Sequence, residues 1–274
     1  MIPFWKYQAI GNDFPFFREE DTAGINLRRL AIKAADRKFG IGGDGILVLG
    51  KRGENLVELQ MFNPDGTEDF CGNGLRIAAK FAFDNKLVGS KFTLLHRDVP
   101  VQAEVLSSGR IRTTLGIASY DPEEVPVQSE DEIYDDLIGI VDGVEYVGSA
   151  LTTGSTHSII PVEKLPSDEE IVRIGPAIEN LPIFPDRTSV IFTRTIGPRE
   201  LEIRIWERGV GETLGCGTGS SAAAADHFRR IGAGGDVVVH NSGGDIVVSM
   251  SKWNAPLTIE GTAELVYSGH FQMP

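Results

Sequence analysis

Short apolar runs alternate with clusters of Gly, Pro and Asp along most of the chain. This is the pattern of strands joined by turns, because each apolar run is too short for a buried helix and is bounded by residues that favour turns. The runs that predict strands are 46–49, 57–62, 92–95, 101–105, 111–115, 190–193, 201–206, 237–240, 246–250 and 257–266.

Helical spacing of apolar residues is rarer than strand patterning. Asn26 is a candidate N-cap for a helix that carries Leu27, Leu30, Ala31 and Ala34. Ser167 and Glu170 form a capping-box pattern ahead of Ile171, Ile174 and Ile178. Two further helices are expected directly after Cys71 and Cys216, with Leu75, Ala78, Ala79 and Ala82 on the first and Ala222–Ala225 and Phe228 on the second.

The two cysteine segments mark an internal repeat. Both read C-G-x-G, as Cys71-Gly72-Asn73-Gly74 and as Cys216-Gly217-Thr218-Gly219. A G-N pair, Gly11-Asn12, precedes the first at nearly the distance at which Gly154-Ser155 precedes the second, and His96 and His240 follow at matching distances. Each half then reads strand, G-[NS] turn, helix, two strands, C-G-x-G, helix, strand and hairpin, and this order carries the repeat because identity within it is weak.

The repeat predicts the domain organisation. We expect an α+β fold of two pseudo-symmetric domains, each a strand-rich sheet wrapped around a central helix, with an active-site cleft between them. The first half-repeat is expected at 1–118 and the second at 119–262, with a seam near 116–121. The last strand lacks a partner in this count, so 263–274 is expected to cross back and complete the first half.

Composition narrows the function classes. Lys and Arg number 26 against 39 Asp and Glu, a net charge of −13 with no basic cluster, which disfavours nucleic acid. The start lacks the pattern of a secretory signal, and no apolar run approaches a membrane span, so we expect a cytoplasmic protein. The chain has only 2 Cys, without C-x-x-C or His at ligand spacing, so a structural disulfide and a zinc site are both disfavoured.

A C-G-x-G turn that opens a helix suits acid/base chemistry. It presents backbone N–H groups to an anion such as a carboxylate, and the helix dipole favours a thiolate over a thiol. Two such turns facing each other would place one thiol on each side of a carbon, which is what stereoinversion requires. One thiolate would remove the α-proton and the other thiol would return a proton, while the amides of Gly72–Asn73 and Gly217–Thr218 hold the carboxylate. No cofactor is needed, and neither a P-loop nor a dinucleotide fingerprint is present.

These residues resemble the diaminopimelate epimerase family. The matching motifs, in order along the chain, are G-N-D-F (11–14), F-N-P-D-G-T (62–67), F-C-G-N-G-L-R (70–76), E-R-G-V-G-E-T-L-G-C-G-T-G (207–219) and N-S-G-G (241–244). The long E-R-G string is the most specific of them. The related proline racemases share the paired cysteines but not this string, and phenazine-type isomerases share the fold but not the cysteine pair.

The resemblance implies a cofactor-independent isomerase that converts LL-2,6-diaminopimelate to the meso form, a step in lysine and peptidoglycan precursor synthesis. Cys71 and Cys216 would be the acid/base pair. The matched positions for substrate contact are Asn12, Asn63, Gly72, Asn73, Glu207, Arg208, Gly217 and Thr218. Arg208 can grip a carboxylate with two hydrogen bonds, and Glu207 can pair with an ammonium group.

Departures from the family gather at the distal end of the expected substrate. Gly154-Ser155-Thr156-His157 stands where the family usually has G-N-P-H. Ser189 aligns with an Asn, and Gly45 aligns with a Gln-like polar residue. The catalytic half of the pattern is therefore intact, and the half that reads the distal amino-acid end is altered.

Simpler interpretations stay open for each group. The cysteines can be inert buried thiols, Glu207 and Arg208 a surface ion pair, and Asn12 and Asn63 turn residues. His157, His96 and His240 are more typical of structural histidines than of catalysts. Three functions remain: diaminopimelate epimerisation, racemisation of another amino acid by the same thiols, and a binding protein without catalysis. For partners we expect a small amino-acid substrate, no nucleic acid and no membrane, with a homodimer left open.

Overall fold

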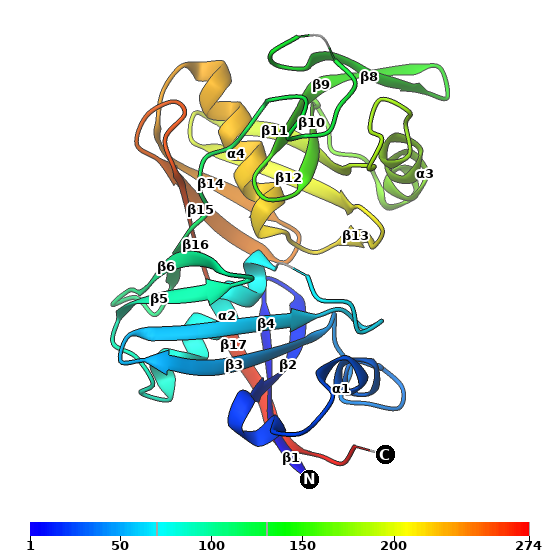
Figure 1. The fold of residues 1–274 in the computed structure, drawn as a ribbon. Coiled ribbons are helices and arrows are strands. Elements are labelled where there is room, and N and C mark those ends of the chain that lie inside the picture. Colours follow the sequence, from blue (N-terminus) through cyan, green and yellow to red (C-terminus); the bar gives the residue numbers. More distant parts are fainter. Residues whose placement is uncertain (70, 130, 274) are drawn as a thin grey trace. The chain divides into compact units, whose positions relative to one another are not determined.

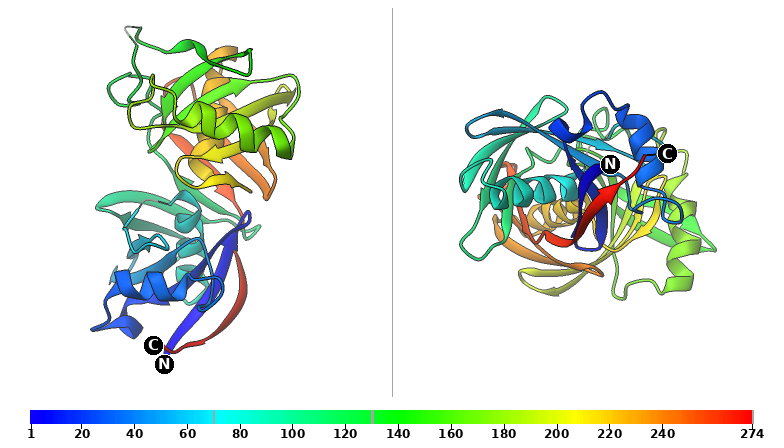
Figure 2. Two further views of the ribbon diagram at one scale, coloured as in Figure 1. Left: turned by 90° about the vertical axis from the view of Figure 1, so that its right-hand side faces the viewer. Right: turned by 90° about the horizontal axis from the view of Figure 1, so that it is seen from below.

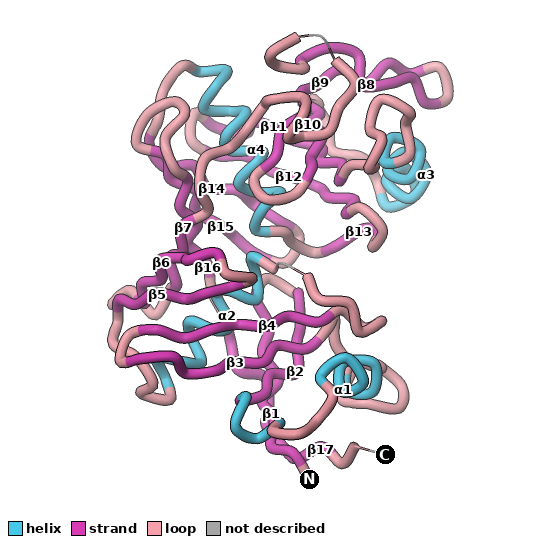
Figure 3. Tube along the Cα trace, viewed as in Figure 1, coloured by secondary structure: helices cyan, strands magenta, loops and turns pink. Residues whose placement is uncertain are grey.

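The computed structural model describes residues 1–69, 71–129 and 131–273. Phe70 of the F-C-G-N-G-L-R motif and Pro274 of the expected last strand therefore lie outside the described residues. The chain divides into two compact units, which are Met1–Thr114 with Glu260–Pro274 (unit 1) and Leu115–Ile259 (unit 2). Strands far outnumber helices along the Cα trace (Figure 3).

Unit 1 is a twisted mixed sheet. Its strands, in spatial order, are β17 (Glu264–Phe271), β1 (Ile2–Ala9), β2 (Asn12–Arg18), β3 (Ile46–Gly53), β4 (Leu56–Phe62), β5 (Lys91–His96), β6 (Val99–Val105) and β7 (Ile111–Thr114). The pairs β2–β3 and β4–β5 are parallel and the other neighbours are antiparallel. A parallel pair needs a crossover, and the helices supply it, since α1 (Leu27–Ala34) connects β2 to β3 and α2 (Gly72–Asp84) connects β4 to β5. A short 3₁₀ helix, Glu19–Thr22, precedes α1.

Both faces of the central strands of unit 1 are buried. Phe16 and Leu47 pack in the cluster around α2, whereas their neighbours Phe17 and Ile46 pack in the cluster around α1. Because successive side chains of a strand point to opposite faces, the sheet separates the two helices (Figure 1). The helix α2 is almost wholly buried, which fits its apolar, Ala-rich sequence.

Unit 2 follows the same plan. Its sheet order is β8 (Asp135–Val141), β9 (Val144–Thr152), β10 (Thr156–Pro161), β11 (Ser189–Gly197), β12 (Glu200–Glu207), β14 (Gly235–Asn241) and β15 (Gly244–Met250). The parallel pairs are β10–β11 and β12–β14, with α3 (Asp168–Glu179) and α4 (Gly217–Ile231) as the crossovers. A short β13 (Gly211–Thr213) pairs with β12, and β16 (Leu257–Gly261) carries the chain back to unit 1. Apart from the short β13, the strands β9 to β15 repeat β1 to β6 in order, so the α+β class and the repeated halves are confirmed.

Strand β17 runs beside β1 for its whole length. Their antiparallel register pairs Ile2 with Phe271, and β17 occupies the position in unit 1 that β8 occupies in unit 2. In both views of Figure 2 the first and last strands lie side by side. The predicted single strand 257–266 is wrong in this respect, because β16 ends at Gly261 and β17 begins at Glu264.

The helix starts agree with the capping patterns. The Asn26 side chain accepts the Arg29 N–H at 3.1 Å, and Ser167 and Glu170 form both bonds of a capping box. The strands β1, β2, β8, β9, β10 and the short β13 are absent from the predicted runs. Polar or proline residues interrupt their apolar pattern, as Lys6 does in β1, Pro15 in β2 and His157 in β10, although Lys6 and His157 are buried.

Candidate active site

Cys71 is the N-cap residue of α2. Its backbone is extended (φ −136°, ψ 110°), and its sulfur accepts the backbone N–H of Gly74 at 3.2 Å. A Cβ at position 74 would lie 3.3 Å from the Cβ of Cys71 and 3.0 Å from the Leu47 side chain, so glycine gives the sulfur room. The sulfur thus lies at the positive end of the helix dipole, where a negative charge is stabilised.

Cys216 repeats this arrangement in unit 2. It caps α4 with an extended backbone (φ −130°, ψ 124°), and its sulfur accepts the N–H of Gly219 at 3.4 Å. The Thr218 hydroxyl lies 3.2 Å from the same sulfur. Gly217 and Thr218 form the first turn of α4, as Gly72 and Asn73 form that of α2. The repeat seen in the sequence is therefore a repeat of local geometry around each sulfur.

The amide side chain of Asn12 lies at the Cys71 sulfur and contacts that of Asn73. The Asn12 Oδ1 atom is 3.7 Å from Sγ and accepts the side-chain N–H of Asn73 at 3.3 Å. Asn12 opens β2 after a turn in which Gly11 has φ 86°. Asn12, Cys71, Gly72 and Asn73 are thus brought together within unit 1, and all four were expected in the site.

His96 holds the backbone of Cys71. Its Nε2 accepts the Cys71 N–H at 3.2 Å, and its Nδ1 lies 3.0 Å from the carbonyl of Leu59. A carbonyl only accepts, so Nδ1 carries the proton and Nε2 is free of one. Burial lowers the pKa of His96, which keeps this neutral form. His96 therefore has a structural role, which is to position the backbone of the cysteine.

In unit 2 a chain of polar contacts leads away from Cys216. The Ser155 hydroxyl lies 3.5 Å from the Thr218 hydroxyl and 3.3 Å from Nε2 of His157. Thr153 adds a hydrogen bond to the Thr218 carbonyl at 2.9 Å. Burial, with a smaller effect of the Arg208 charge, lowers the pKa of His157 to about 4, so its ring is neutral near pH 7.

Glu207 and Arg208 lie where β12 ends and the chain turns toward β13. The Thr213 hydroxyl donates to Glu207 at 2.5 Å, and the Arg208 guanidinium donates to the carbonyl of Asp186 at 2.9 Å. The Arg208 backbone N–H donates to the Ser189 hydroxyl at 3.1 Å. Ser189, one of the departures from the family pattern, is therefore engaged in holding the turn.

A residue that sequence reasoning missed supports the same turn. Glu179, 5% exposed at the end of α3, accepts the Gly209 N–H at 2.9 Å and the Trp206 indole N–H at 2.7 Å. Arg187 pairs with the same carboxylate at 2.9 Å. The only sequence signal is a Glu at the end of a helix that the apolar spacing otherwise predicts well.

Gly45 precedes β3 and Asn63 follows β4, at the end where Ile46 pairs with Phe62. Asn63 follows β4, and its side chain donates to the Thr67 hydroxyl at 3.1 Å within the N-P-D-G-T turn. Gly45 has φ 154°, and a Cβ there would lie 2.4 Å from the carbonyl oxygen of Phe62. The departure at Gly45 therefore has a backbone cause, because the chain passes too close for any side chain.

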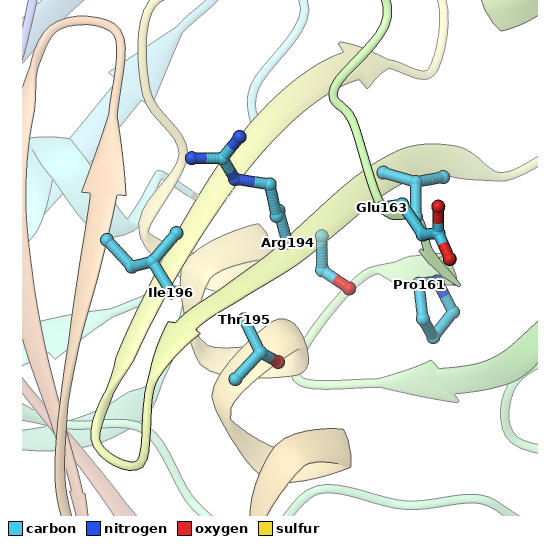
Figure 4. A pocket seen from close by; sticks show the side chains of 7 residues that line it. Pro161, Glu163, Arg194, Thr195 and Ile196 are labelled. Carbon is cyan, nitrogen blue, oxygen red and sulfur yellow. The ribbon is translucent and has the colours of Figure 1, made fainter.

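A hollow of about 730 Å³ in unit 2 is lined by other residues, among them Glu163, Arg194 and Thr195 (Figure 4). Its lining includes none of the residues that the sequence placed in the site. Within 1–69, 71–129 and 131–273, no cluster of three or more His, Cys, Asp or Glu side chains is arranged for a metal ion. Among the helices that the structure describes, none is long and apolar enough to cross a membrane.

Comparison with solved structures places the fold. The chain superposes on a Bacillus anthracis phenazine biosynthesis protein of the PhzF family with a TM-score of 0.68, at 17% identity and 98% coverage of both chains. A hydroxyproline epimerase from Agrobacterium vitis gives a TM-score of 0.69 at 12% identity, covering 99% of this chain and 90% of that one. At such identities the likeness concerns the fold alone.

Sequence comparison is more specific. The family model described as diaminopimelate epimerase matches residues 4–120 and 149–266. A diaminopimelate epimerase from Alkaliphilus metalliredigens is 33% identical over 277 residues, covering 98% of this chain and 96% of that protein. One from Methanothermobacter thermautotrophicus is 31% identical over 281 residues, covering 98% of each. Since the family model and the full-length relatives agree, this chain belongs to the diaminopimelate epimerase family and is an isomerase.

Proposed function

We propose that this protein converts LL-2,6-diaminopimelate to the meso form, with Cys71 and Cys216 as the acid/base pair and without a cofactor. One observation carries the proposal: each unit holds one cysteine, and each cysteine caps a central helix in the same way. Membership of the family supports the substrate.

The proposed reaction moves two protons. The thiolate of one cysteine takes the α-proton and becomes a thiol, and the electron pair of the C–H bond passes into the α-carbon and its carboxylate. The thiol of the other cysteine then gives its proton to the opposite face of the carbon and becomes a thiolate. The two cysteines end with exchanged protonation states, so the reverse reaction uses the same groups.

The N-termini of α2 and α4 would supply the electrostatic stabilisation of the substrate carboxylate in this reaction. The N–H groups of Gly72, Asn73, Gly217 and Thr218 lie in the first turns of α2 and α4, which the sequence leaves without acidic residues. Such N-termini bind carboxylates, and their donors gain strength as charge develops in the transition state. Arg208 and Glu207 are proposed to bind the carboxylate and the ammonium group at the far end of the substrate.

Deuterium exchange at Cα in heavy water tests this function. LL-diaminopimelate should exchange its α-hydrogen as it epimerises. Cys71→Ala and Cys216→Ala should each lower turnover by at least about 10²-fold, because a general acid or base contributes about 10²–10⁴-fold. Normal turnover by either variant would refute the two-cysteine mechanism, and no exchange with any amino acid would leave a binding protein as the interpretation.

A second candidate is a racemase for another amino acid that uses the same cysteines. The observation in its favour is that Ser155 and Ser189 are already engaged, with His157 and Thr218 in one case and with the Arg208 backbone in the other. The comparison to make is kcat/KM for LL-diaminopimelate against lysine, glutamate, ornithine and histidine. A preference of more than about tenfold, about 1.4 kcal/mol, for one of the four would replace the first proposal.

A further inference from the structure

The carboxylate of Asp44 fixes which way the Asn12 amide points. The Asn12 Nδ2 atom lies 2.5 Å from Oδ2 of Asp44. A carboxylate only accepts hydrogen bonds, so the NH₂ end of the amide must face Asp44. The carbonyl end then faces the other way, and this is the atom that lies 3.7 Å from the Cys71 sulfur.

The charge of Arg76 fixes the orientation of the neighbouring Asn73 amide, and this orientation is compatible with that of Asn12. The Arg76 guanidinium, which is fully buried, donates to Oδ1 of Asn73 at 2.6 Å. A guanidinium only donates, so the NH₂ end of Asn73 must face Asn12, whose Oδ1 it reaches at 3.3 Å. The chain Asp44–Asn12–Asn73–Arg76 thus has one polarity, and turning either amide over would bring two donors or two acceptors together.

Asp44 is itself held in place from several directions. Arg37 donates to its Oδ1 at 2.7 Å, and the backbone N–H of Asp13 donates to its Oδ2 at 3.0 Å. The Asp44 N–H in turn donates to the Asp13 carbonyl at 2.8 Å. Asp13 is anchored by the buried Lys6 at 2.6 Å. Several hydrogen bonds within unit 1 therefore hold the carboxylate that orients Asn12.

We propose that Asp44 is a positioning residue that acts through Asn12 to keep a hydrogen-bond acceptor against the sulfur of Cys71. The inference rests on the proposed function for its catalytic meaning, because it concerns the cysteine assigned there as an acid/base. An acceptor at this distance favours the S–H form of Cys71. The contact at Cys216 differs in kind, since the Thr218 hydroxyl can donate to its sulfur.

Other groups also lie near Cys71. His96 on β5 accepts the cysteine backbone N–H as a neutral ring. Charged residues of the adjoining segments include Glu68 and Asp69 ahead of the cysteine, Arg76 on α2, Arg97 after β5, and Lys6, Asp13 and Arg37 around Asp44. Among the hydrogen bonds that the described residues show, the one from Asn12 to the Asp44 carboxylate requires the NH₂ end of the Asn12 amide. A change at Asp44 removes a charge as well as an acceptor, so the test must separate the two effects.

The chain offers a clean background for that test, because Cys71 and Cys216 are its only cysteines. In the full-length Cys216→Ser protein, the rate of alkylation by iodoacetamide against pH reports the thiolate of Cys71 alone. Asp44→Ala removes both charge and acceptor. Asp44→Asn removes the charge but keeps an oxygen for Asn12, because the Asp13 N–H favours the amide oxygen at that place and the exposed Arg37 can move.

We expect the midpoint of the Cys71 profile to fall further in Asp44→Ala than in Asp44→Asn, by about half a pH unit, or about threefold in thiolate at a fixed pH below the midpoint. The rate at the alkaline plateau should stay unchanged in both variants. In an Asn12→Ala background, the two Asp44 variants should give the same midpoint, since the amide through which Asp44 acts is gone. In Cys71→Ser protein, the profile of Cys216 should not respond to either variant.

Three results would overturn the proposal. If Asp44→Ala and Asp44→Asn gave equal midpoints in the presence of Asn12, the negative charge of Asp44 alone would explain its effect on Cys71. A difference that survives in Asn12→Ala would mean that Asp44 acts by another route. A rise of the plateau rate without a midpoint shift would show that the variant merely exposes Cys71. Alkylation needs no substrate, so failure here is distinct from failure of Cα exchange, which would instead remove the proposed function.

Discussion

The carboxylate of Glu179 accepts the backbone N–H of Gly209 at 2.9 Å, and so ties the end of α3 to the turn that carries Glu207 and Arg208. Trp206 donates to the other carboxylate oxygen at 2.7 Å. The geometry of the turn therefore depends on a buried acid that the E-R-G-V-G motif does not contain.

Glu179→Gln should loosen this turn while keeping the side-chain volume. We expect a loss of about 1–3 kcal/mol in unfolding free energy, because a buried group loses charge-assisted hydrogen bonds. KM for the substrate should rise more than kcat falls, since Arg208 is proposed to bind substrate rather than to transfer a proton. Denaturant unfolding measures the change in stability, and steady-state kinetics measure KM and kcat.

The control is Glu169→Gln, at an exposed position on the same helix, which should change stability by less than about 0.5 kcal/mol. An equal effect of both variants would contradict the role of Glu179.

Because His157 is buried, we expect the folded protein to be less stable in acid. Burial lowers the pKa of His157 to about 4, below the value of about 6.5 that the unfolded chain has. Between these values the unfolded state binds more protons, so the folded state loses stability as the pH falls from about 6.5 toward 4. His96, whose pKa burial also lowers, adds to the effect in the same direction.

His157→Gln should therefore flatten this dependence. From pH 7.5 to pH 5, we expect the wild-type protein to lose about 2 kcal/mol more than the variant, at about 1.4 kcal/mol for each pKa unit. Urea unfolding at the two pH values measures the difference, which is independent of any loss that the substitution causes at pH 7.5. If the stabilities of the two proteins fell in parallel with pH, His157 would take up a proton as readily in the folded state as in the unfolded state.

Thr218→Val should raise the midpoint for thiolate formation at Cys216. The substitution keeps the shape of the side chain but removes the hydroxyl that lies 3.2 Å from the sulfur. A donor stabilises the thiolate, so its loss favours the thiol, by about half to one pH unit for a hydrogen bond of about 1 kcal/mol. Alkylation against pH in Cys71→Ser protein measures this. Thr218→Ser, which keeps a hydroxyl, should leave the midpoint in place, and a shift of both variants would assign the effect to the methyl group instead.

Gly45→Gln, which introduces the residue type that the family resemblance implies at this position, should destabilise this protein rather than improve it. The backbone at position 45 has φ 154°, and a Cβ would collide with the Phe62 carbonyl. Strain of this kind costs about 1–3 kcal/mol, which thermal unfolding can detect. Gly53→Ala, at the other end of β3, meets only an ordinary contact at 3.5 Å and should be nearly neutral. Unchanged stability of Gly45→Gln would show that the backbone can shift there at little cost.

The sequence predicts the repeated architecture better than it predicts individual strands. The order of turns, cysteines and helices is readable from the sequence because Gly11 provides a positive φ of 86° and because Cys71 and Cys216 cap α2 and α4 through their side chains. The strands β1 and β10 were missed because Lys6 and His157 are buried polar residues that interrupt the apolar pattern, Lys6 in an ion pair with Asp13 and His157 in contact with the Ser155 hydroxyl. Apolar periodicity cannot signal a position whose buried side chain is polar and is satisfied by an ion pair or a hydrogen bond.

For the candidate site, the motif residues could be named from the sequence, but the residues that hold them in place could not. Asp44 and Glu179 lie outside the motif strings, and each accepts a hydrogen bond from a motif residue, Asn12 in one case and Gly209 in the other. Such roles follow from distances that only the folded chain defines. The assignment of Asn63, Glu207 and Arg208 to the substrate stays a prediction, to be checked by the kinetic comparisons above.

The pairing of β17 with β1 makes unit 1 discontinuous along the chain, while unit 2 is one uninterrupted segment. During synthesis, domains generally fold as soon as their sequence is available, from the N-terminus onward. Here that order is inverted. The ribosome delivers all of Leu115–Ile259 before it reaches β17, so the unit that begins first is finished last, and β1 keeps one unpaired edge until β17 emerges.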